Sequence, residues 1–163
     1  MISRDKYAPI LKGKYGEFTA LSKLDDEIKQ NIIPIVDLLQ FVPQVVKDPK
    51  KKEKTFDDYV NTIIKYFSDK WEKERLIYID FYLFDNEKKM KDGTHPINYI
   101  FNSLLKAEYN VIPVLHSSLN EKTKNIIVDS VSKFDKGVCL RIPIDIKTEI
   151  NTDIDVTDHF IPQ

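Results

Sequence analysis

Cysteine is almost missing from this sequence, which has only Cys139 among its 163 residues. One cysteine excludes an internal disulfide framework and a zinc site built from cysteines. Glycine is scarce as well, and the four glycines, at positions 13, 16, 93 and 137, never form a glycine-rich loop. The sequence therefore lacks the dinucleotide-binding fingerprint and the Walker phosphate loop, and we expect no bound cofactor.

Long hydrophobic runs and an excess of one charge are also missing. No run approaches the about 18 apolar residues that a membrane span needs, and no signal-peptide stretch opens the sequence. Lysine and arginine number 25 against 26 acidic residues, which argues against nucleic-acid binding by bulk electrostatics. We therefore expect a cytoplasmic protein that is not attached to a membrane and has no nucleic-acid partner.

Five short aliphatic segments are present, and each is followed by a polar residue or a proline. They are Ala8–Lys12, Ile33–Asp37, Leu76–Asp80, Ile112–His116 and Val138–Pro143. Consecutive aliphatic residues are typical of strands that are buried on both faces, as in parallel sheets. A proline at the beginning of such a strand is tolerated, because its missing N–H need not join the ladder.

Helical patterns lie between these segments. The first covers Glu17–Asn31, with Phe18, Leu21, Leu24 and Ile28 facing inward and a break expected near Asp25. Thr55–Asp58 and Ser118–Glu121 resemble capping boxes that begin two further helices, and Pro96 suits the first turn of another. The alternation of strands and helices predicts an α/β fold with about five parallel strands.

The strand count distinguishes the two common architectures of this class only in part. The dinucleotide fingerprint would favour a doubly wound sheet, but it is missing from this sequence. A complete (β/α) barrel needs about 200–250 residues, which is more than this chain has. We predict that residues 1–163 form a single domain, a partial TIM-type barrel, with a small open sheet as the alternative. No closing helix is predicted after Ile146, so we expect a longer protein or a partner to complete the barrel there.

Two charged or polar segments are expected to be loops. Residues 47–54 combine lysines with Asp48, Glu53 and a proline, without periodicity. A nucleic-acid patch is the more specific interpretation of this segment, but mixed charges and missing aromatic residues favour a solvated connector.

The segment Tyr7–Leu21 resembles the opening of the "beta protein" family of bacteriophages and bacteria. Shared features are an aromatic residue, a proline, a lysine pair, Gly16-Glu17 and Ala20-Leu21. The resemblance continues at Ile33–Asp37, where the family more often has glutamate at the last position, and more weakly at Asp80, Pro113-Val114 and Arg141. Members of this family look like TIM-type barrels and are usually about twice this length, so the resemblance implies that residues 1–163 match the N-terminal half of such a barrel. It also implies a phage or mobile-element setting. It implies no catalytic residues.

Polar residues at the strand ends are the candidates for a ligand site, because functional groups gather there in barrels. The six candidates are Lys12, Lys14, Asp37, Asp80, His116 and Arg141. Two carboxylates, a histidine and several cations could bind a metal with phosphate or perform acid–base chemistry. Phosphate suits Lys12, Lys14 and Arg141 in particular. Structural ion pairing is the alternative explanation of the whole set.

The remaining motifs point to no known chemistry. His-x-x-x-His and Ser-centred nucleophile motifs are missing, so the sequence predicts neither a zinc protease nor an α/β-hydrolase, and no metal site. Cys139 lies between aliphatic residues, where a buried and unreactive thiol is expected.

Two functions remain open at this stage. The first is a protein that acts by protein interaction in phage–host conflict, with a protein partner or a second copy completing the barrel. The second is a barrel enzyme or binder of a phosphorylated or anionic small molecule that uses the polar strand ends. A nuclease is a third possibility, supported only by the basic segment at 47–54.

Overall fold

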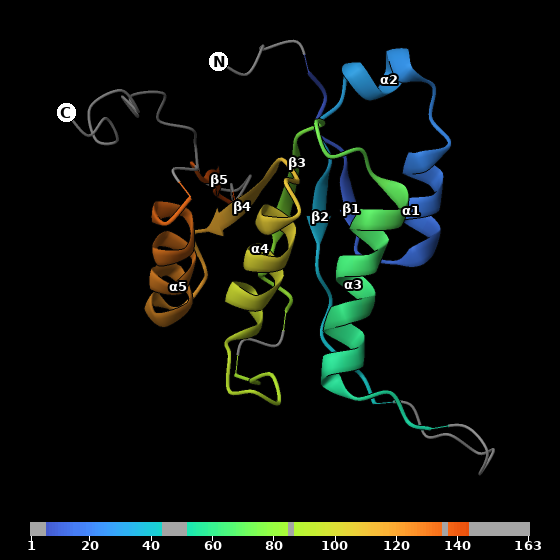
Figure 1. Ribbon diagram of the computed structural model, residues 1–163. Helices are drawn as coiled ribbons and strands as arrows, with labels where there is room; N and C mark the ends of the chain where they lie inside the picture. Colours follow the sequence, from blue (N-terminus) through green and yellow to red (C-terminus); the bar gives the residue numbers. More distant parts are fainter. Residues whose placement is uncertain (1–5, 44–51, 85–86, 135–136, 144–163) are drawn as a thin grey trace, which may run out of the picture.

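Five parallel strands form one sheet in the computed structural model, which describes residues 6–43, 52–84, 87–134 and 137–143 (Figure 1). The strands are β1 (Ile10–Lys12), β2 (Ile35–Asp37), β3 (Ile77–Asp80), β4 (Val111–His116) and β5 (Cys139–Arg141). All four neighbouring pairs are parallel, which confirms the prediction from the aliphatic segments.

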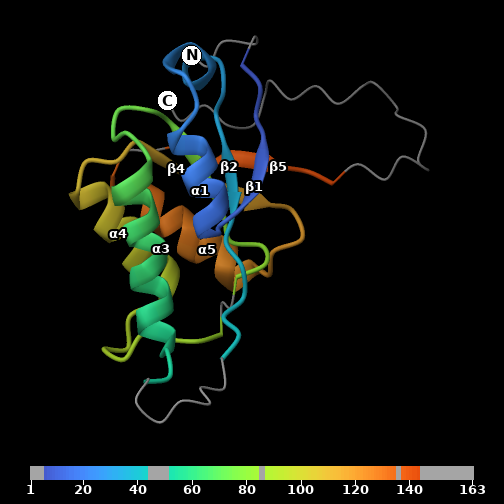
Figure 2. The same ribbon diagram turned by 90° about the vertical axis from the view of Figure 1, so that its right-hand side faces the viewer.

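Five described helices connect the strands. They are α1 (Tyr15–Ser22), α2 (Asp26–Gln30), α3 (Phe56–Lys70), α4 (Pro96–Lys106) and α5 (Glu121–Ser132). In Figure 2, α1, α3, α4 and α5 lie together on one face of the sheet, and no described helix covers the opposite face. The strand order is the sequence order, β1-β2-β3-β4-β5.

This arrangement separates the two architectures that the sequence leaves open. A doubly wound sheet reverses its strand order at a switch point and carries helices on both faces. Here the order never reverses and the helices stay on one face, as they do around a (β/α) barrel. Because β1 and β5 are not joined, the described sheet is a partial barrel, as predicted.

Two apolar layers account for the residue types of the strands. Val36, Ile79 and Val111 point into the helix layer and are buried there with Phe67 of α3 and Phe101 of α4. A smaller cluster forms on the opposite face, and its buried members are Ile33, Tyr78 and Val114. Both faces of the central strands are therefore apolar, which explains their continuous aliphatic pattern.

Helix starts follow the predicted capping chemistry with one exception. Thr55 and Asp58 form a complete capping box at α3, and Pro96 occupies the first turn of α4. At α5, however, the residue that caps the helix is Asn120, whose side chain accepts the N–H of Thr123 at 2.8 Å. The prediction of Ser118 as the cap is wrong, because residues 116–119 form a turn before the helix begins.

The first predicted helix is divided, as the expected break near Asp25 implies. α1 ends at Ser22 and α2 begins at Asp26, so the inward stripe does not continue across the break. Phe18 and Leu21 are buried, but Ile28 is exposed, and the inward orientation predicted for it is wrong. Lys29 is buried instead, and its Nζ donates to Glu72 at 2.8 Å.

Most of the charged segment at 47–54, and the chain after Ile146, lie outside the described residues. Residues 52–54 are described and are exposed without regular secondary structure, as expected for a loop. Among the described helices, none is long and apolar enough to cross a membrane.

Candidate functional site

Each of the five strands ends on one of the predicted site residues. These are Lys12 on β1, Asp37 on β2, Asp80 on β3, His116 on β4 and Arg141 on β5. Lys12, Asp37 and Asp80 are register partners, and so are His116 and Arg141. Register partners in parallel strands point to the same face, here the one opposite the helices. We call these five residues the polar ring.

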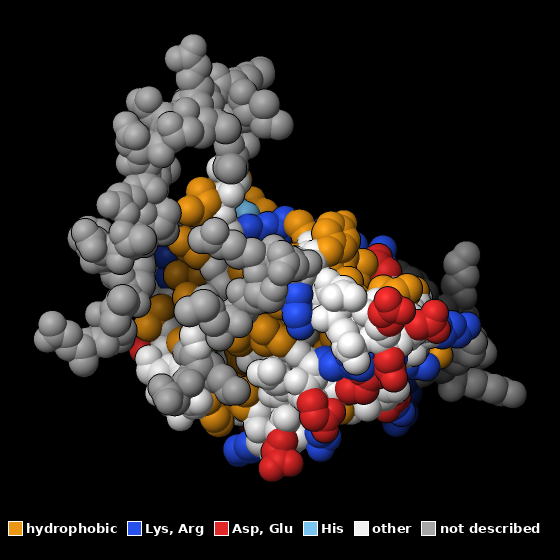
Figure 3. Space-filling view, turned by 90° about the horizontal axis from the view of Figure 1, so that it is seen from above, with side chains coloured by type: hydrophobic (Ala, Val, Ile, Leu, Met, Phe, Trp, Pro, Cys, Tyr) orange, Lys and Arg blue, Asp and Glu red, His pale blue; other side chains and the backbone are white. Residues whose placement is uncertain are grey.

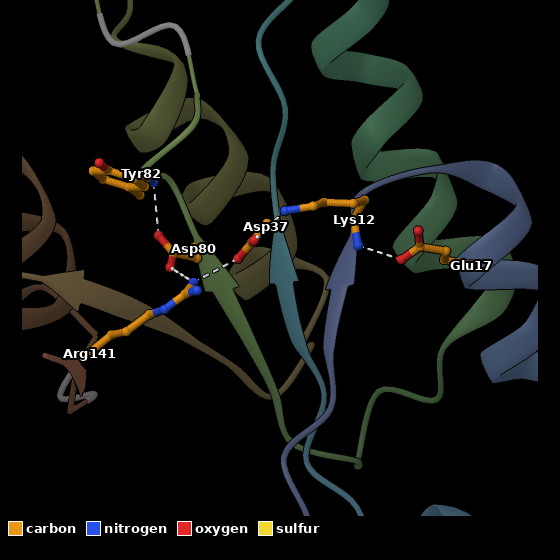
Figure 4. Close-up of polar contacts among 6 residues, drawn as sticks. All are labelled: Lys12, Glu17, Asp37, Asp80, Tyr82 and Arg141. Atoms are coloured by element: carbon orange, nitrogen blue, oxygen red, sulfur yellow. Dashed lines mark hydrogen bonds and ion pairs between the residues drawn. The ribbon is translucent and has the colours of Figure 1, made fainter. Parts of the chain in front are cut away.

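Arg141 joins the two aspartates of the polar ring (Figure 4). Its Nη1 donates to Asp37 Oδ1 at 2.9 Å and to Asp80 Oδ2 at 2.6 Å. On the other side of Asp37, Lys12 Nζ donates to Oδ2 at 2.8 Å. Two cations and two carboxylates from four strands thus form one continuous chain of ion pairs.

The bond between Arg141 and Asp37 requires a strongly curved sheet. β2 and β5 are separated by β3 and β4, so their backbones in a flat sheet would be three strand spacings, about 14 Å, apart. Side chains leave a sheet roughly at right angles, so an arginine and an aspartate would not meet across that distance. Their contact at 2.9 Å means that β5 curves over toward β2, as in the wall of a barrel.

The two carboxylates are buried, and the arginine compensates their charge. Asp37 is 5% exposed and Asp80 is 1% exposed. Burial by itself disfavours the charged guanidinium of Arg141, but hydrogen bonds and charge attraction from Asp80 and Asp37 outweigh it and raise the Arg141 pKa. Arg141 therefore stays charged at any physiological pH.

His116 joins the polar ring through Tyr82. The backbone N–H of Tyr82 donates to Asp80 Oδ1 at 2.8 Å, and the Tyr82 ring stacks on His116 with centroids 4.1 Å apart. His116 Nδ1 accepts the N–H of Ser118 at 3.1 Å, so a neutral imidazole carries its proton on Nε2. The imidazole is thus held on its face and at one nitrogen.

Sequence reasoning missed Glu17 as a member of this site. Tyr82 belongs to the aromatic cluster Phe81, Tyr82 and Phe84 that follows β3, for which the sequence favours the lining of a ligand mouth and packing under the next loop equally. Glu17, in the first turn of α1, accepts the backbone N–H of Lys12. These contacts place Lys12 and His116 but do not make either residue reactive.

Lys14 does not belong to the polar ring. It is the residue before α1, and its exposed side chain lines a separate hollow with Tyr15 and Tyr66. The structure therefore brings five of the six predicted residues together and places the sixth elsewhere.

The chemistry available at the polar ring is limited. Its lysine, arginine and two aspartates balance in charge, and the described residues contain no group of three or more acidic, histidine or cysteine ligands suited to a metal ion. Cys139 lies nearby on β5, where burial and the charge of Asp80 raise its pKa against the opposing effect of Arg141. Its thiol is therefore protonated at neutral pH and is a poor nucleophile.

Comparison with known proteins gives one match. The family model described as Beta protein matches residues 7–156, which is most of the chain. No curated protein matches the sequence, and no solved structure matches it either.

Proposed function

The chain belongs to the Beta protein family, and we propose that it acts by protein interaction in phage–host conflict, through the two open edges of its sheet. The partner that we propose is a second copy of the chain, which joins its β5 edge to the β1 edge of the first. The observation that carries the proposal is an apolar hollow beside β1. The conflict setting is supported by the family resemblance.

The hollow beside β1 is the place where a full barrel would carry its next unit. It has a volume of about 330 Å³ and is lined by side chains of β1, α1, α2 and the residues beside them. Leu11, Leu21, Leu24 and Ile28 are among its apolar lining residues, and Glu17 is its only charged lining residue in the described chain. We call it the edge hollow. An apolar hollow beside a strand edge that no described strand pairs with favours association.

The opposite edge of the sheet is apolar as well. Val138, Leu140 and Ile142 of the β5 segment are 40%, 50% and 60% exposed. Viewed from the end where the strands begin, hydrophobic side chains gather on one part of the surface and charged ones on another (Figure 3). Because all strands run in one direction, pairing of β5 with β1 of a second copy would continue the parallel sheet.

Light scattering after size-exclusion chromatography tests this proposal. We expect the wild-type chain to exceed the mass of a single 19.1 kDa chain and to dissociate on dilution. Leu140→Glu is expected to return it to single-chain mass, because a charge at the new strand pair is costly to bury. Lys65→Glu on the exposed surface of α3 is the control, and it should leave the mass unchanged.

A single-chain mass for the wild type at every concentration would contradict self-association. Equal loss of mass in the Leu140 and Lys65 variants would also contradict it, since the effect would then not be specific to the β5 edge. Circular dichroism checks that each variant retains its helices.

Binding of an anionic small molecule at the polar ring is a second candidate, favoured by the guanidinium of Arg141. Only its Nη1 bonds to described residues, and its side chain is 30% exposed, so part of its donor fork is available to a carboxylate or phosphate. We expect inorganic phosphate to raise the melting temperature of the wild type and to have less effect on Arg141→Lys, because lysine lacks the fork. An equal rise in both proteins would contradict this candidate.

A further inference from the structure

A second hollow, separate from the polar ring and from the edge hollow, lies at the other end of β1 and β2. It is bounded by the connection from β1 to α1, by the segment after β2, and by α3. Its volume is about 300 Å³, at the lower end of the range for small-molecule sites. We call it the lysine hollow. Its position is where α/β sheets bind ligands, beyond the carboxyl ends of the strands.

Four aromatic residues line part of the lysine hollow, and they pack on one another and on the core. Phe41 packs on Tyr59 with ring centroids 5.5 Å apart, and Tyr66 packs on Phe18 at 5.8 Å and on Tyr15 at 5.7 Å. A ligand that enters therefore meets rings that are already ordered, which lowers the entropic cost of binding.

Tyr59 also fixes the segment that follows β2. Its hydroxyl donates to the carbonyl of Leu39 at 2.6 Å. Burial raises the pKa of Tyr59 to about 12, with the neighbouring Tyr66 contributing and the bond to Leu39 opposing. The hydroxyl therefore remains a neutral donor, and the wall containing Phe41 keeps its shape over the physiological pH range.

The charge of the lysine hollow is positive. Lys14 and Lys54 line it, and no acidic residue is among its described lining residues. Neither lysine forms an ion pair with a described residue. Lys54 contributes by charge attraction to the lowered pKa of Asp58. The Asp58 carboxylate, however, is already hydrogen-bonded to Thr55 in the capping box of α3. Two ammonium groups thus remain for an anion beside flat hydrophobic walls.

We propose that the lysine hollow binds a nucleoside monophosphate, with the base against the aromatic walls and the phosphate at Lys14 and Lys54. Aromatic rings accept any base by stacking, and lysine ammonium groups complement phosphate oxygens. The volume favours a mononucleotide over a dinucleotide. The inference depends neither on self-association nor on the polar ring, since it uses none of their residues.

Calorimetric titration of the full chain with AMP, adenosine and inorganic phosphate tests the assignment. We expect AMP to bind. Adenosine and phosphate should each bind about tenfold more weakly or not at all, because adenosine keeps only the contact of the base with the aromatic rings and phosphate keeps only the contact with the lysines. The double variant K14Q/K54Q should lose about tenfold or more in AMP affinity, and added salt should weaken wild-type binding. F41L should weaken AMP more than phosphate.

Control variants make the result decisive. K65Q removes an exposed lysine on α3 outside the lysine hollow and should leave AMP affinity unchanged. Absence of AMP binding to the wild type would overturn the proposal, as would equal affinities of the wild type and K14Q/K54Q. Loss of AMP binding in Arg141→Lys with K14Q/K54Q unaffected would place the ligand at the polar ring and overturn it too.

Discussion

Replacement of Arg141 by methionine is expected to lower the free energy of unfolding by about 3 kcal/mol at neutral pH. The change leaves Asp37 and Asp80 buried, and both carboxylates bond to the same nitrogen in the wild type, so they face one another. Removing one partner of a buried ion pair costs more than the pair contributes, because the remaining charge cannot return to water. Urea unfolding at a fixed protein concentration measures the loss.

The pH dependence identifies the cause of that loss. A carboxyl group without charge needs no counter-ion, so the loss of Arg141 is costly only where the two groups are ionised. The deficit relative to the wild type should therefore be small in acid and should grow as the pH rises to neutrality. A deficit of equal size at all pH values would instead indicate lost packing of the arginine side chain.

Lys124→Met is the matched control for this experiment. Lys124 also bonds a carboxylate, that of Glu121 at 2.7 Å, but Glu121 is largely exposed and lies one helical turn away. Exposed pairs of this kind contribute little to stability, so the control should change the free energy of unfolding by less than about 0.5 kcal/mol. A comparable loss in both variants would contradict the special role of burial.

Truncation of Phe67 to alanine is expected to destabilise the protein by about 3–5 kcal/mol. Phe67 of α3 is fully buried, and its ring meets the edge of Phe18 with centroids 4.8 Å apart. α1 and α3 therefore share this contact, and its loss leaves a cavity between both helices and the sheet. Thermal and urea unfolding, followed by circular dichroism, would measure the effect.

Val128→Ala on α5 is the control for the loss of methyl groups without a core cavity. Val128 is 44% exposed, so most of the removed surface is already in contact with water. The expected change is within about 0.5 kcal/mol. If Phe67→Ala were as mild as this control, the helix layer could not be packed on the sheet as described.

The residues of the polar ring could be predicted from the sequence because each one occupies the same position in a repeated local pattern. Each strand is a short aliphatic segment with a polar residue at its end, and parallel strands bring equivalent ends to one edge. Asp37, Asp80 and Arg141 are therefore expected at one edge of the sheet. Their ion pairs depend in addition on the curvature that brings β5 toward β2, and the sequence pattern does not contain that curvature.

Lys14 lies only two residues after Lys12, so the sequence pattern groups it with the residues of the polar ring. The chain turns sharply at Gly13, whose N–H donates to the Asp37 carbonyl at 2.8 Å. A Cβ at this glycine would stand 3.0 Å from Leu38 Cδ2, so a side chain here would require Leu38 to shift. After this turn, Lys14 lies at the lysine hollow. The order of residues along the chain does not predict the direction of the turn.

Other details depend on contacts between distant segments. Ser118 and Asn120 can both cap a helix, and the choice of Asn120 follows from the turn in which Ser118 N–H bonds to His116. The stack of Tyr82 on His116 joins residues of different strand ends. The two residues of such a contact are separated by no fixed number of positions in the sequence, so residue periodicity does not predict the contact.

The ion pairs of Arg141 across the sheet also bear on how the chain folds during its synthesis. Arg141 bonds to residues 61 and 104 positions earlier in the chain, so both aspartates leave the ribosome long before their counter-ion does. Lys12 is already available to Asp37, but Arg141 is the only cation that bonds to Asp80 among the described residues. Burying Asp80 before β5 is made would leave its charge uncompensated, so we expect the sheet to close around Asp80 only after β5 has emerged.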